Sequence, residues 1–507
     1  MKLSLESLCV LSVGWLFSFA VYADIQPASP FTDHMVLQRD LPVPIWGKAE
    51  PHEEVQVSCA GQIKSTKADA KGQWRVTLDP LSGSSDPITF EILSNDDGEK
   101  VAFFDVVVGE VWICSGQSNM QMGVNASPEL KKLFEEAEGI RSFTVKRTVA
   151  FTEQDSLEGE WAVVAPDSAV ACSFAHFLRQ SVDVPVGIIL TAWGSSSIEA
   201  WMPRDMTERL PHFKTIMEEW DADTEGHERI EGVLAAGEWN KEDDIFMRRQ
   251  SNIVYNAMMK PLAPYACRGL VWYQGERNTR FITGMPEEPQ YMRVAGILEY
   301  DETMLAWMER YRREWQRKDF HFLVVMLPGY GQILNSGPDG DEESPDTHSW
   351  AWMRESQMKA LELSHTGVAN TIDLGDVKNI HPKDKLPIGE RLALLAERDT
   401  LGHKVVAEGP VFKKVERNGA EIVVHFDHAD GLKTVDGESP GAFWVAAESA
   451  GWSRAVGRIE GNTVVLNSVE IEAPLHVRYA FAGKPAVNLV NDAGLPAYPF
   501  RTDTFAP

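Results

Sequence analysis

Ser118 and His381 are the two side chains in this sequence best suited to nucleophilic catalysis. Ser118 follows an apolar run and the tight polar turn that begins at Ser115, and His381 lies in a short polar loop bounded by Pro382. A serine hydroxyl becomes a strong nucleophile only when a nearby base removes its proton, and imidazole serves as such a base. Taken singly, Ser118 could equally cap a helix, and His381 could be an ordinary loop histidine. Taken together, they predict acyl transfer.

Acyl transfer also requires hydrogen-bond donors for the negative oxygen of the tetrahedral intermediate. The candidate donors are the backbone N–H groups of Ser118 and Gly194 and the side-chain amide of Gln274. Each is a weak signal alone, since Gly194 could be a turn and Gln274 a polar strand end. The G-x-S-x-G pattern of α/β-hydrolases is absent because Met120 occupies its last position. We therefore expect a serine hydrolase of another fold.

Each of these candidates follows an apolar run. In the middle of the chain such apolar runs alternate with helical stretches. Such alternation predicts a parallel sheet covered on both faces, in which ligands bind beyond the carboxyl ends of the strands. Four of the five predicted strand ends deliver small or catalytic-type residues to that edge. The predicted strands are Val106–Cys114, Gly187–Ala192, Gly269–Tyr273, Phe322–Leu327 and Gly367–Ile372.

The regions on either side of this middle part have a different pattern. Residues 24–104 and 401–507 contain short β runs separated by Gly- and Pro-rich turns, which predicts a small β-sandwich at each end. The catalytic domain is then expected over residues 105–400. An acidic helical insertion at about residues 205–250 is expected to form a solvated face or a lid over the site.

Composition and the N-terminus restrict the classes of partner. The chain has 48 Lys and Arg against 75 Asp and Glu, a net charge of −27, which disfavours nucleic acid and anionic membrane surfaces. Residues 1–23 have the pattern of a signal peptide, so we expect a periplasmic or secreted protein without a membrane span. The oligomeric state is not predicted, nor is any disulfide pairing among Cys59, Cys114, Cys172 and Cys267.

Several motifs together resemble one family. They are Ser115-Gly-Gln-Ser118-Asn-Met, Ala192-Trp-Gly-Ser, Ile198-Glu-Ala-Trp201, Trp272-Tyr-Gln-Gly-Glu276 and Ile380-His-Pro-x-x-Lys385, with Asn488-Leu-x-Asn491 near the C-terminus. The chain resembles the bacterial sialate O-acetylesterases, which are SGNH-type hydrolases. The resemblance implies an α/β fold with a flavodoxin-like catalytic domain flanked by β-sandwiches. It also implies Ser118 as nucleophile, His381 as base and an oxyanion hole from Ser118, Gly194 and Gln274.

One departure from the family concerns the group that orients His381. Members often carry an acidic residue shortly before the histidine, whereas Lys378, Asn379 and Ile380 stand there in this chain. Asn379 cannot supply a charge, so the acceptor is either Asp376 or a main-chain carbonyl of the same loop. We favour Asp376.

Other residues of the site loops are candidates for binding a sugar. Trp193 and Trp201 can stack on sugar rings, although tryptophan is equally a core residue. Arg277 is suited to an anionic sugar, or pairs with acidic residues such as Glu287 and Glu288. We also select Asn119 and Asn278 as substrate-binding residues.

We expect no metal or other cofactor. The His425-Phe-Asp427-His428 segment resembles a metal-ligand cluster, but His428 would point away from the other two side chains of the strand.

The favoured function is therefore a serine esterase that hydrolyses O-acetyl groups of sugars, with O-acetylated sialic acids as the favoured substrate. One alternative is an acetyl esterase acting on xylan or another plant or algal polysaccharide. The other is a non-catalytic carbohydrate-binding protein, which would not need the pair of Ser118 and His381.

Overall fold

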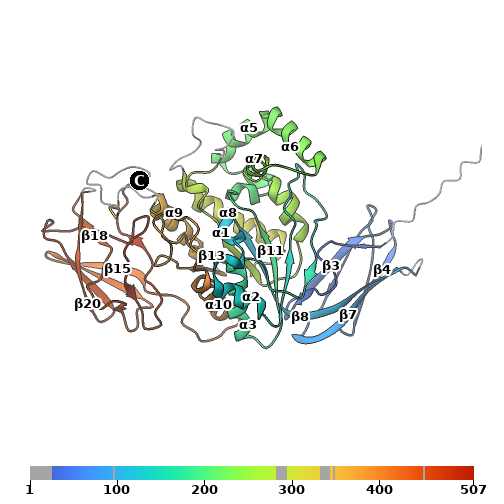
Figure 1. Ribbon diagram of the computed structural model, residues 1–507, viewed down its shortest axis with the longest axis horizontal. Helices are drawn as coiled ribbons and strands as arrows, with labels where there is room; N and C mark the ends of the chain where they lie inside the picture. Colours follow the sequence, from blue (N-terminus) through green and yellow to red (C-terminus); the bar gives the residue numbers. More distant parts are fainter. Residues whose placement is uncertain are drawn as a thin grey trace, which may run out of the picture.

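The structure is a computed structural model that describes residues 25–94, 98–280, 294–331, 343–345, 349–448 and 451–506. Its parts lie in a row: an N-terminal β region, a central α/β region and a C-terminal β region (Figure 1). The expected signal peptide, residues 1–23, lies outside the described residues.

The central region is built on one mixed sheet. Its strands pair in parallel except for β10, which is antiparallel to β9. The sequence pattern predicts five of these strands but not β9 and β10. In spatial order the strands are β10 (Trp161–Ala162), β9 (Ile140–Thr144), β11 (Val186–Ala192), β8 (Lys100–Gly116), β12 (Gly269–Tyr273), β13 (His321–Val325) and β14 (Thr366–Ala369).

Helices cover both faces of this sheet. The rings of Trp307 and Phe322 on β13 pack 5.3 Å apart, so Phe322 faces α8, which carries Trp307. The next residue, Leu323, meets Leu395 of α10 over Gly367. Neighbouring residues of a strand point to opposite faces, so α8 and α10 lie on opposite sides of the sheet. The helices are α1 (Ser118–Gln121), α2 (Pro128–Glu135), α3 (Ala169–Ser181), α4 (Arg204–Thr207), α8 (Ile297–Glu314), α9 (Ser349–Met358) and α10 (Leu386–Thr400).

The N-terminal region is continuous with the central sheet through β8. The first half of this long strand pairs with β7, and its second half pairs with β11 and β12. The domain boundary expected after residue 104 therefore lies inside a strand rather than in a linker. The remaining strands of this region are β1 (Gln26–Pro27), β2 (Val36–Gln38), β3 (Val43–Lys48), β4 (Glu54–Cys59), β5 (Gln62–Lys67), β6 (Gln73–Leu78) and β7 (Ser84–Ser94).

The C-terminal region has two four-stranded antiparallel sheets and a two-stranded one. The first sheet is β15 (Val411–Asn418), β16 (Glu421–Asp427), β21 (Thr463–Asn467) and β20 (Val456–Glu460). The second is β19 (Trp452–Arg454), β18 (Phe443–Ala446), β22 (His476–Tyr479) and β24 (Phe500–Arg501), and β17 (Lys433–Thr434) pairs with β23 (Leu489–Val490).

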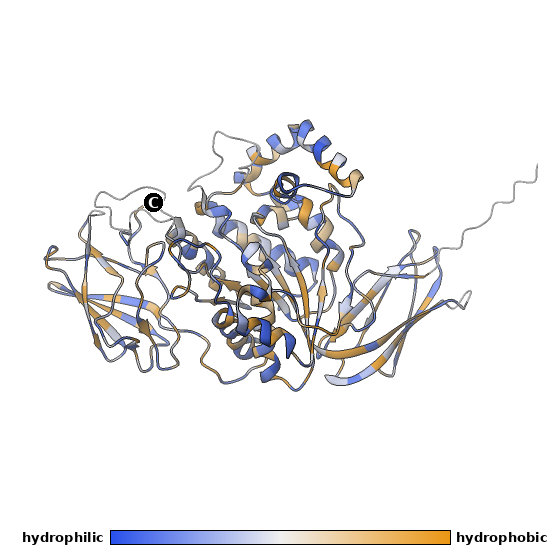
Figure 2. Ribbon diagram, viewed as in Figure 1, coloured by the Kyte–Doolittle hydropathy of each residue, from blue (hydrophilic) through white to orange (hydrophobic). Residues whose placement is uncertain are grey.

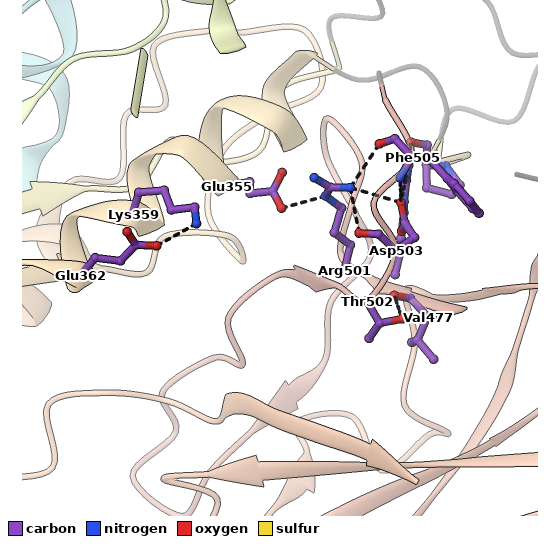
Figure 3. A network of polar contacts seen from close by, with 10 residues as sticks. Glu355, Lys359, Glu362, Val477, Arg501, Thr502, Asp503 and Phe505 are labelled. Atoms are coloured by element: carbon purple, nitrogen blue, oxygen red, sulfur yellow. Dashed lines mark hydrogen bonds and ion pairs between the residues drawn. The ribbon is translucent and has the colours of Figure 1, made fainter. Parts of the chain in front are cut away.

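Two arginines connect this region to helix α9. Arg501 of β24 donates to Glu355 of α9 at 2.7 Å and to Asp503 (Figure 3). Arg354 of α9 is fully buried and donates to the carbonyls of Ala482 and Gly483. Because a buried guanidinium is costly without acceptors, these bonds fix α9 against the C-terminal region.

The expected acidic insertion folds as three helices, α5 (Lys214–Ala222), α6 (Thr224–Ala236) and α7 (Lys241–Met247). They form the projecting part of the central region, and their ribbon shows extended hydrophilic stretches (Figures 1 and 2). Only a few of their side chains, including Ile216, Trp220 and Phe246, are buried.

Short 3₁₀ turns occupy Val124–Ala126, Ile198–Trp201, Pro211–Phe213, Lys260–Leu262, Asn278–Arg280 and Lys359–Glu362, and one π turn occupies Tyr255–Met259.

The four cysteines expected in the mature chain are all buried and free of disulfides. In the described ranges no helix is long and apolar enough to cross a membrane.

Candidate active site

The structure brings Ser118 and His381 together at the carboxyl edge of the central sheet. Ser118 is the first residue of α1, directly after β8, and His381 lies in the loop between β14 and α10. The His381 Nε2 atom lies 2.8 Å from Ser118 Oγ. A neutral imidazole that accepts the hydroxyl proton at Nε2 fits this contact, and this is the arrangement a serine nucleophile requires.

A glycine makes the turn into Ser118 possible. Gly116 ends β8 with a φ of 141°, a conformation that side-chain-bearing residues rarely adopt. A Cβ at this position would lie 2.1 Å from the carbonyl oxygen of Tyr273 on the neighbouring strand β12. Glycine therefore lets the chain turn toward the cavity while β8 and β12 stay paired.

Asp376 is in the same loop as His381 but has another role in the structure. Its Oδ1 atom accepts the backbone N–H groups of Lys378 and Asn379 at 2.7 and 2.9 Å, and Asn379 Oδ1 accepts the N–H of His381 at 3.0 Å. These bonds shape the loop backbone. Between the described side chains there is no hydrogen bond from the His381 ring to Asp376, so the structure does not bring the favoured orienting group to the imidazole.

The pKa of His381 is held below its usual range. Burial is the larger cause, and the positive charge of Lys385 is the second. Both effects disfavour the imidazolium, so the ring is kept in the neutral form that can act as a base.

Asn119 connects the serine loop to the histidine loop. It is fully buried, and its amide nitrogen donates to Glu276 Oε1 at 2.5 Å and to the carbonyl of Ile380 at 3.1 Å. Its amide oxygen accepts from Lys385 Nζ at 2.6 Å. Burial raises the pKa of Glu276 to about 7 and lowers that of Lys385 to about 7. Asn119 therefore links two ionisable groups, Glu276 and Lys385, at the position next to Ser118 in the chain.

Ser118 and His381 line a cavity of about 510 Å³. Arg248 and Arg249, which follow the insertion helix α7, line it together with Arg277. Asp244 of α7 accepts from Trp193 and pairs with Arg248 at 2.8 Å, which ties the insertion to the cavity wall. The remaining lining residues are Gln117, Gln121, Met122, Gly194, Ser195, Glu276 and Ile380.

The two expected oxyanion donors beside Ser118 differ in position. Gly194 lines the cavity next to Ser118, and its N–H donates to the side-chain oxygen of Gln121 at 2.6 Å. Gln274 is fully buried and does not line the cavity. Its amide nitrogen donates to Gln117 at 3.1 Å and to Asn278 at 2.8 Å, so it connects the loops from behind.

Most of the expected substrate-binding residues are part of the scaffold instead. Arg277 lines the cavity, whereas Asn119, Trp193, Trp201 and Asn278 are completely buried and do not. The Trp201 indole donates to Ser196, and Asn278 holds both Gln274 and Glu199. These four side chains are held behind the cavity wall by their hydrogen-bond partners, and their contact with a sugar stays a prediction. Glu287 and Glu288, named as partners for Arg277, lie outside the described residues.

Other site residues were not identified from the sequence as functional. Gln121, Arg248 and Arg249 reach the cavity from a short helix and from the end of the insertion. Glu276 and Lys385 do have a sequence signal, because they end two of the motifs that carry the family resemblance. His425, from the segment that resembles a metal-ligand cluster, lies in the C-terminal region with its Nε2 atom 3.5 Å from Glu416 Oε2.

Comparisons with known proteins find similarity to carbohydrate esterases. The family model described as carbohydrate esterase, sialic acid-specific acetylesterase, matches residues 108–244. The sialate O-acetylesterase of Rattus norvegicus is 28% identical over 451 residues, which are 79% of this chain and 77% of that protein. The sialate O-acetylesterase of Homo sapiens is 28% identical over 439 residues, 80% of this chain and 75% of that protein.

A solved structure is similar over almost the whole chain. It is a carbohydrate acetylesterase from Xanthomonas citri, with a TM-score of 0.78 and 32% identity, covering 94% of this chain and all of that one. The match extends across a mixed α/β fold with additional β-sheet regions. The protein is therefore a carboxylic ester hydrolase, and its chain belongs to the carbohydrate acetylesterase family of this Xanthomonas citri protein.

Proposed function

We propose that this protein removes acetyl groups from sugar hydroxyls through an acetyl-serine intermediate on Ser118. The observation that carries the proposal is the 2.8 Å contact between Ser118 Oγ and His381 Nε2 at the wall of the cavity. Family membership supports the acetyl ester of a carbohydrate as the bond that is broken.

In the first half of the reaction, Ser118 Oγ attacks the acetyl carbonyl carbon while His381 Nε2 takes the hydroxyl proton. The carbonyl oxygen becomes negative and is stabilised by the N–H groups of Ser118 and Gly194. The bond from the acetyl carbon to the sugar oxygen then breaks, and His381 returns the proton to that oxygen. The sugar alcohol leaves, and the acetyl group remains on Ser118.

In the second half, a water molecule replaces the sugar. His381 takes a proton from the water as its oxygen attacks the acetyl carbon, and then returns that proton to Ser118 Oγ as acetic acid leaves and loses its remaining proton to solvent. The lowered pKa of His381 keeps the base neutral before each half of the reaction.

The favoured substrate is an O-acetylated sialic acid, which carries a carboxylate. The guanidinium groups of Arg248, Arg249 and Arg277 on the cavity wall support an anionic sugar, because guanidinium matches carboxylate geometry. We further propose that the protein acts in the periplasm or outside the cell, in keeping with the leader-like residues 1–23.

The test is acetate release by the purified protein from O-acetylated sialic acid and from acetylated xylan, with Ser118→Ala beside it. Preference for the sialic acid ester supports the acidic-sugar substrate, and preference for xylan supports the polysaccharide alternative. Activity of Ser118→Ala close to wild type would refute the acetyl-serine mechanism.

A further inference from the structure

Glu276 has one buried carboxylate oxygen for which the described residues supply no hydrogen-bond donor. The residue lines the cavity together with Ser118 and His381 and is only 6% exposed. Its Oε1 atom accepts from Asn119 at 2.5 Å. Its Oε2 atom is buried and has no hydrogen-bond partner among the described residues.

An unpaired oxygen of this kind calls for an explanation. A buried acceptor without a donor has lost its hydration with no hydrogen bond to replace it, and the penalty is larger for a charged group. The other buried glutamate of the site region, Glu199, contrasts with it. Glu199 does not line the cavity, and its two oxygens accept from the backbone of Ala295 at 3.0 Å and from Asn278 at 3.2 Å. Glu276 alone of this pair keeps an acceptor unused, and it is the one at the cavity.

We propose that Glu276 Oε2 accepts a hydrogen bond from a free hydroxyl of the sugar, next to the acetylated position. This inference rests on the proposed function and adds a hydroxyl-recognition subsite to it. Asn119 follows Ser118 in the chain and holds Oε1, so the carboxylate is fixed in the immediate surroundings of the nucleophile. When the acetyl ester of a carbohydrate lies at Ser118, the hydroxyl groups next to that ester are the hydrogen-bond donors near Glu276.

Charge and geometry favour a hydroxyl over other ligands. Above its pKa of about 7 the Glu276 side chain is ionised and can only accept, so the partner must then be a donor. The positive charge of Lys385 acts on Glu276, and three arginines line the same cavity, which disfavours a cationic ligand. The subsite would therefore select acetylated polyols over simple acetyl esters.

The experiment compares three substrates on the full chain. They are 4-nitrophenyl acetate, a mono-O-acetylated methyl glycoside with a free neighbouring hydroxyl, and its counterpart in which that hydroxyl is replaced by hydrogen. For the wild type, kcat/KM should fall roughly 10- to 100-fold from the hydroxyl sugar to the deoxy sugar, as expected for losing a hydrogen bond to a charged group. Equal kcat/KM for the two sugars overturns the proposal without any variant.

The decisive variant is Glu276→Gln, which keeps the acceptor for Asn119 and replaces the second oxygen by an NH₂ group. It should remove most of the discrimination between the two sugars, and kcat/KM should fall roughly tenfold further for the hydroxyl sugar than for 4-nitrophenyl acetate. An equal loss on all three substrates would overturn the proposal and show that Glu276 acts only through Asn119.

Glu199→Gln is the matched control, because it neutralises a second buried glutamate whose pKa burial also raises to about 7. It should leave the ratio between the two sugars unchanged, and a lost ratio in this variant would overturn the assignment to Glu276. Ser118→Ala tests the proposed esterase mechanism separately from the proposed hydroxyl subsite. If Ser118→Ala stays active, the proposed function fails, whatever the glutamate variants do.

Discussion

The side chain of Asn119, one residue after Ser118, donates to the carbonyl of Ile380, one residue before His381, at 3.1 Å. This bond joins two loops that are separated by more than half of the chain. It fixes the loop that carries Ser118 relative to the loop that carries His381. In a site where no described carboxylate contacts the His381 ring, the backbone of the histidine loop is held by Asn119 and by Asn379 instead.

Replacement of Ser118 by alanine should reduce acetyl-ester hydrolysis by roughly 10³-fold or more, because the covalent intermediate can no longer form. The fold should persist, since Ser118 is only partly buried. Mass spectrometry after mixing with substrate should detect an acetyl adduct on the wild type and none on the variant. Residual activity within about tenfold of wild type would disprove the assignment.

Asp376→Asn should be nearly silent in kcat. An asparagine oxygen can accept the same backbone N–H groups of Lys378 and Asn379 that Asp376 Oδ1 now accepts. Asp376→Ala, which removes the acceptor, is the control and should lower activity by loosening the loop. If Asp376→Asn instead lowers kcat about a hundredfold or more, the carboxylate does act on His381, as the sequence alone suggested.

Gln121→Ala should leave kcat/KM for 4-nitrophenyl acetate unchanged or raise it a few-fold. The side-chain oxygen of Gln121 occupies the N–H of Gly194, which the negative oxygen of the intermediate must use. Removing this competing acceptor leaves the donor available to substrate. A loss of roughly tenfold or more would show that Gln121 assists the reaction rather than competing with it.

Arg248→Gln and Arg249→Gln should raise KM for an O-acetylated sialic acid by about tenfold while changing KM for a neutral acetylated sugar little. Both guanidinium groups line the cavity, and their attraction to a carboxylate is weakened by salt. The KM of the wild type for the acidic sugar should therefore rise with ionic strength. Equal effects on acidic and neutral sugars would argue against recognition of the carboxylate.

Lys385→Met should move the acid limb of the kcat/KM profile for 4-nitrophenyl acetate to higher pH. The positive charge of Lys385 helps to lower the pKa of His381, so its removal raises that pKa. Activity requires the neutral imidazole, and a higher pKa means that the neutral form is lost sooner as the pH falls. A thermal melt provides the control for folding, because Lys385 is fully buried. An unshifted limb would show that another group controls it.

The central sheet and the positions of its loops could be predicted from the sequence, because parallel strands buried on both faces are continuous apolar runs. The five predicted runs overlap β8, β11, β12, β13 and β14. Placement of Ser118 and His381 at one edge follows from that topology, since each is in a loop that leaves the carboxyl end of a strand. β9 was missed because its sequence, Ile140–Thr144, contains an arginine, a serine and a threonine in five residues.

Side-chain direction was decided only by the tertiary structure. Trp193, Trp201 and Gln274 stand in loops that reach the site, yet all three are fully buried behind it. Type and spacing cannot reveal this, because a loop residue faces the cavity or the core according to which neighbours pack against it.

The same holds for contacts between distant segments. Glu276 and Lys385 meet through Asn119, and Arg248 reaches the cavity from the end of the insertion. Linear sequence carries the chemistry of each group. The burial that moves their pKa values and the partners that hold them arise only when segments hundreds of residues apart are packed together, because both depend on what surrounds a group in three dimensions.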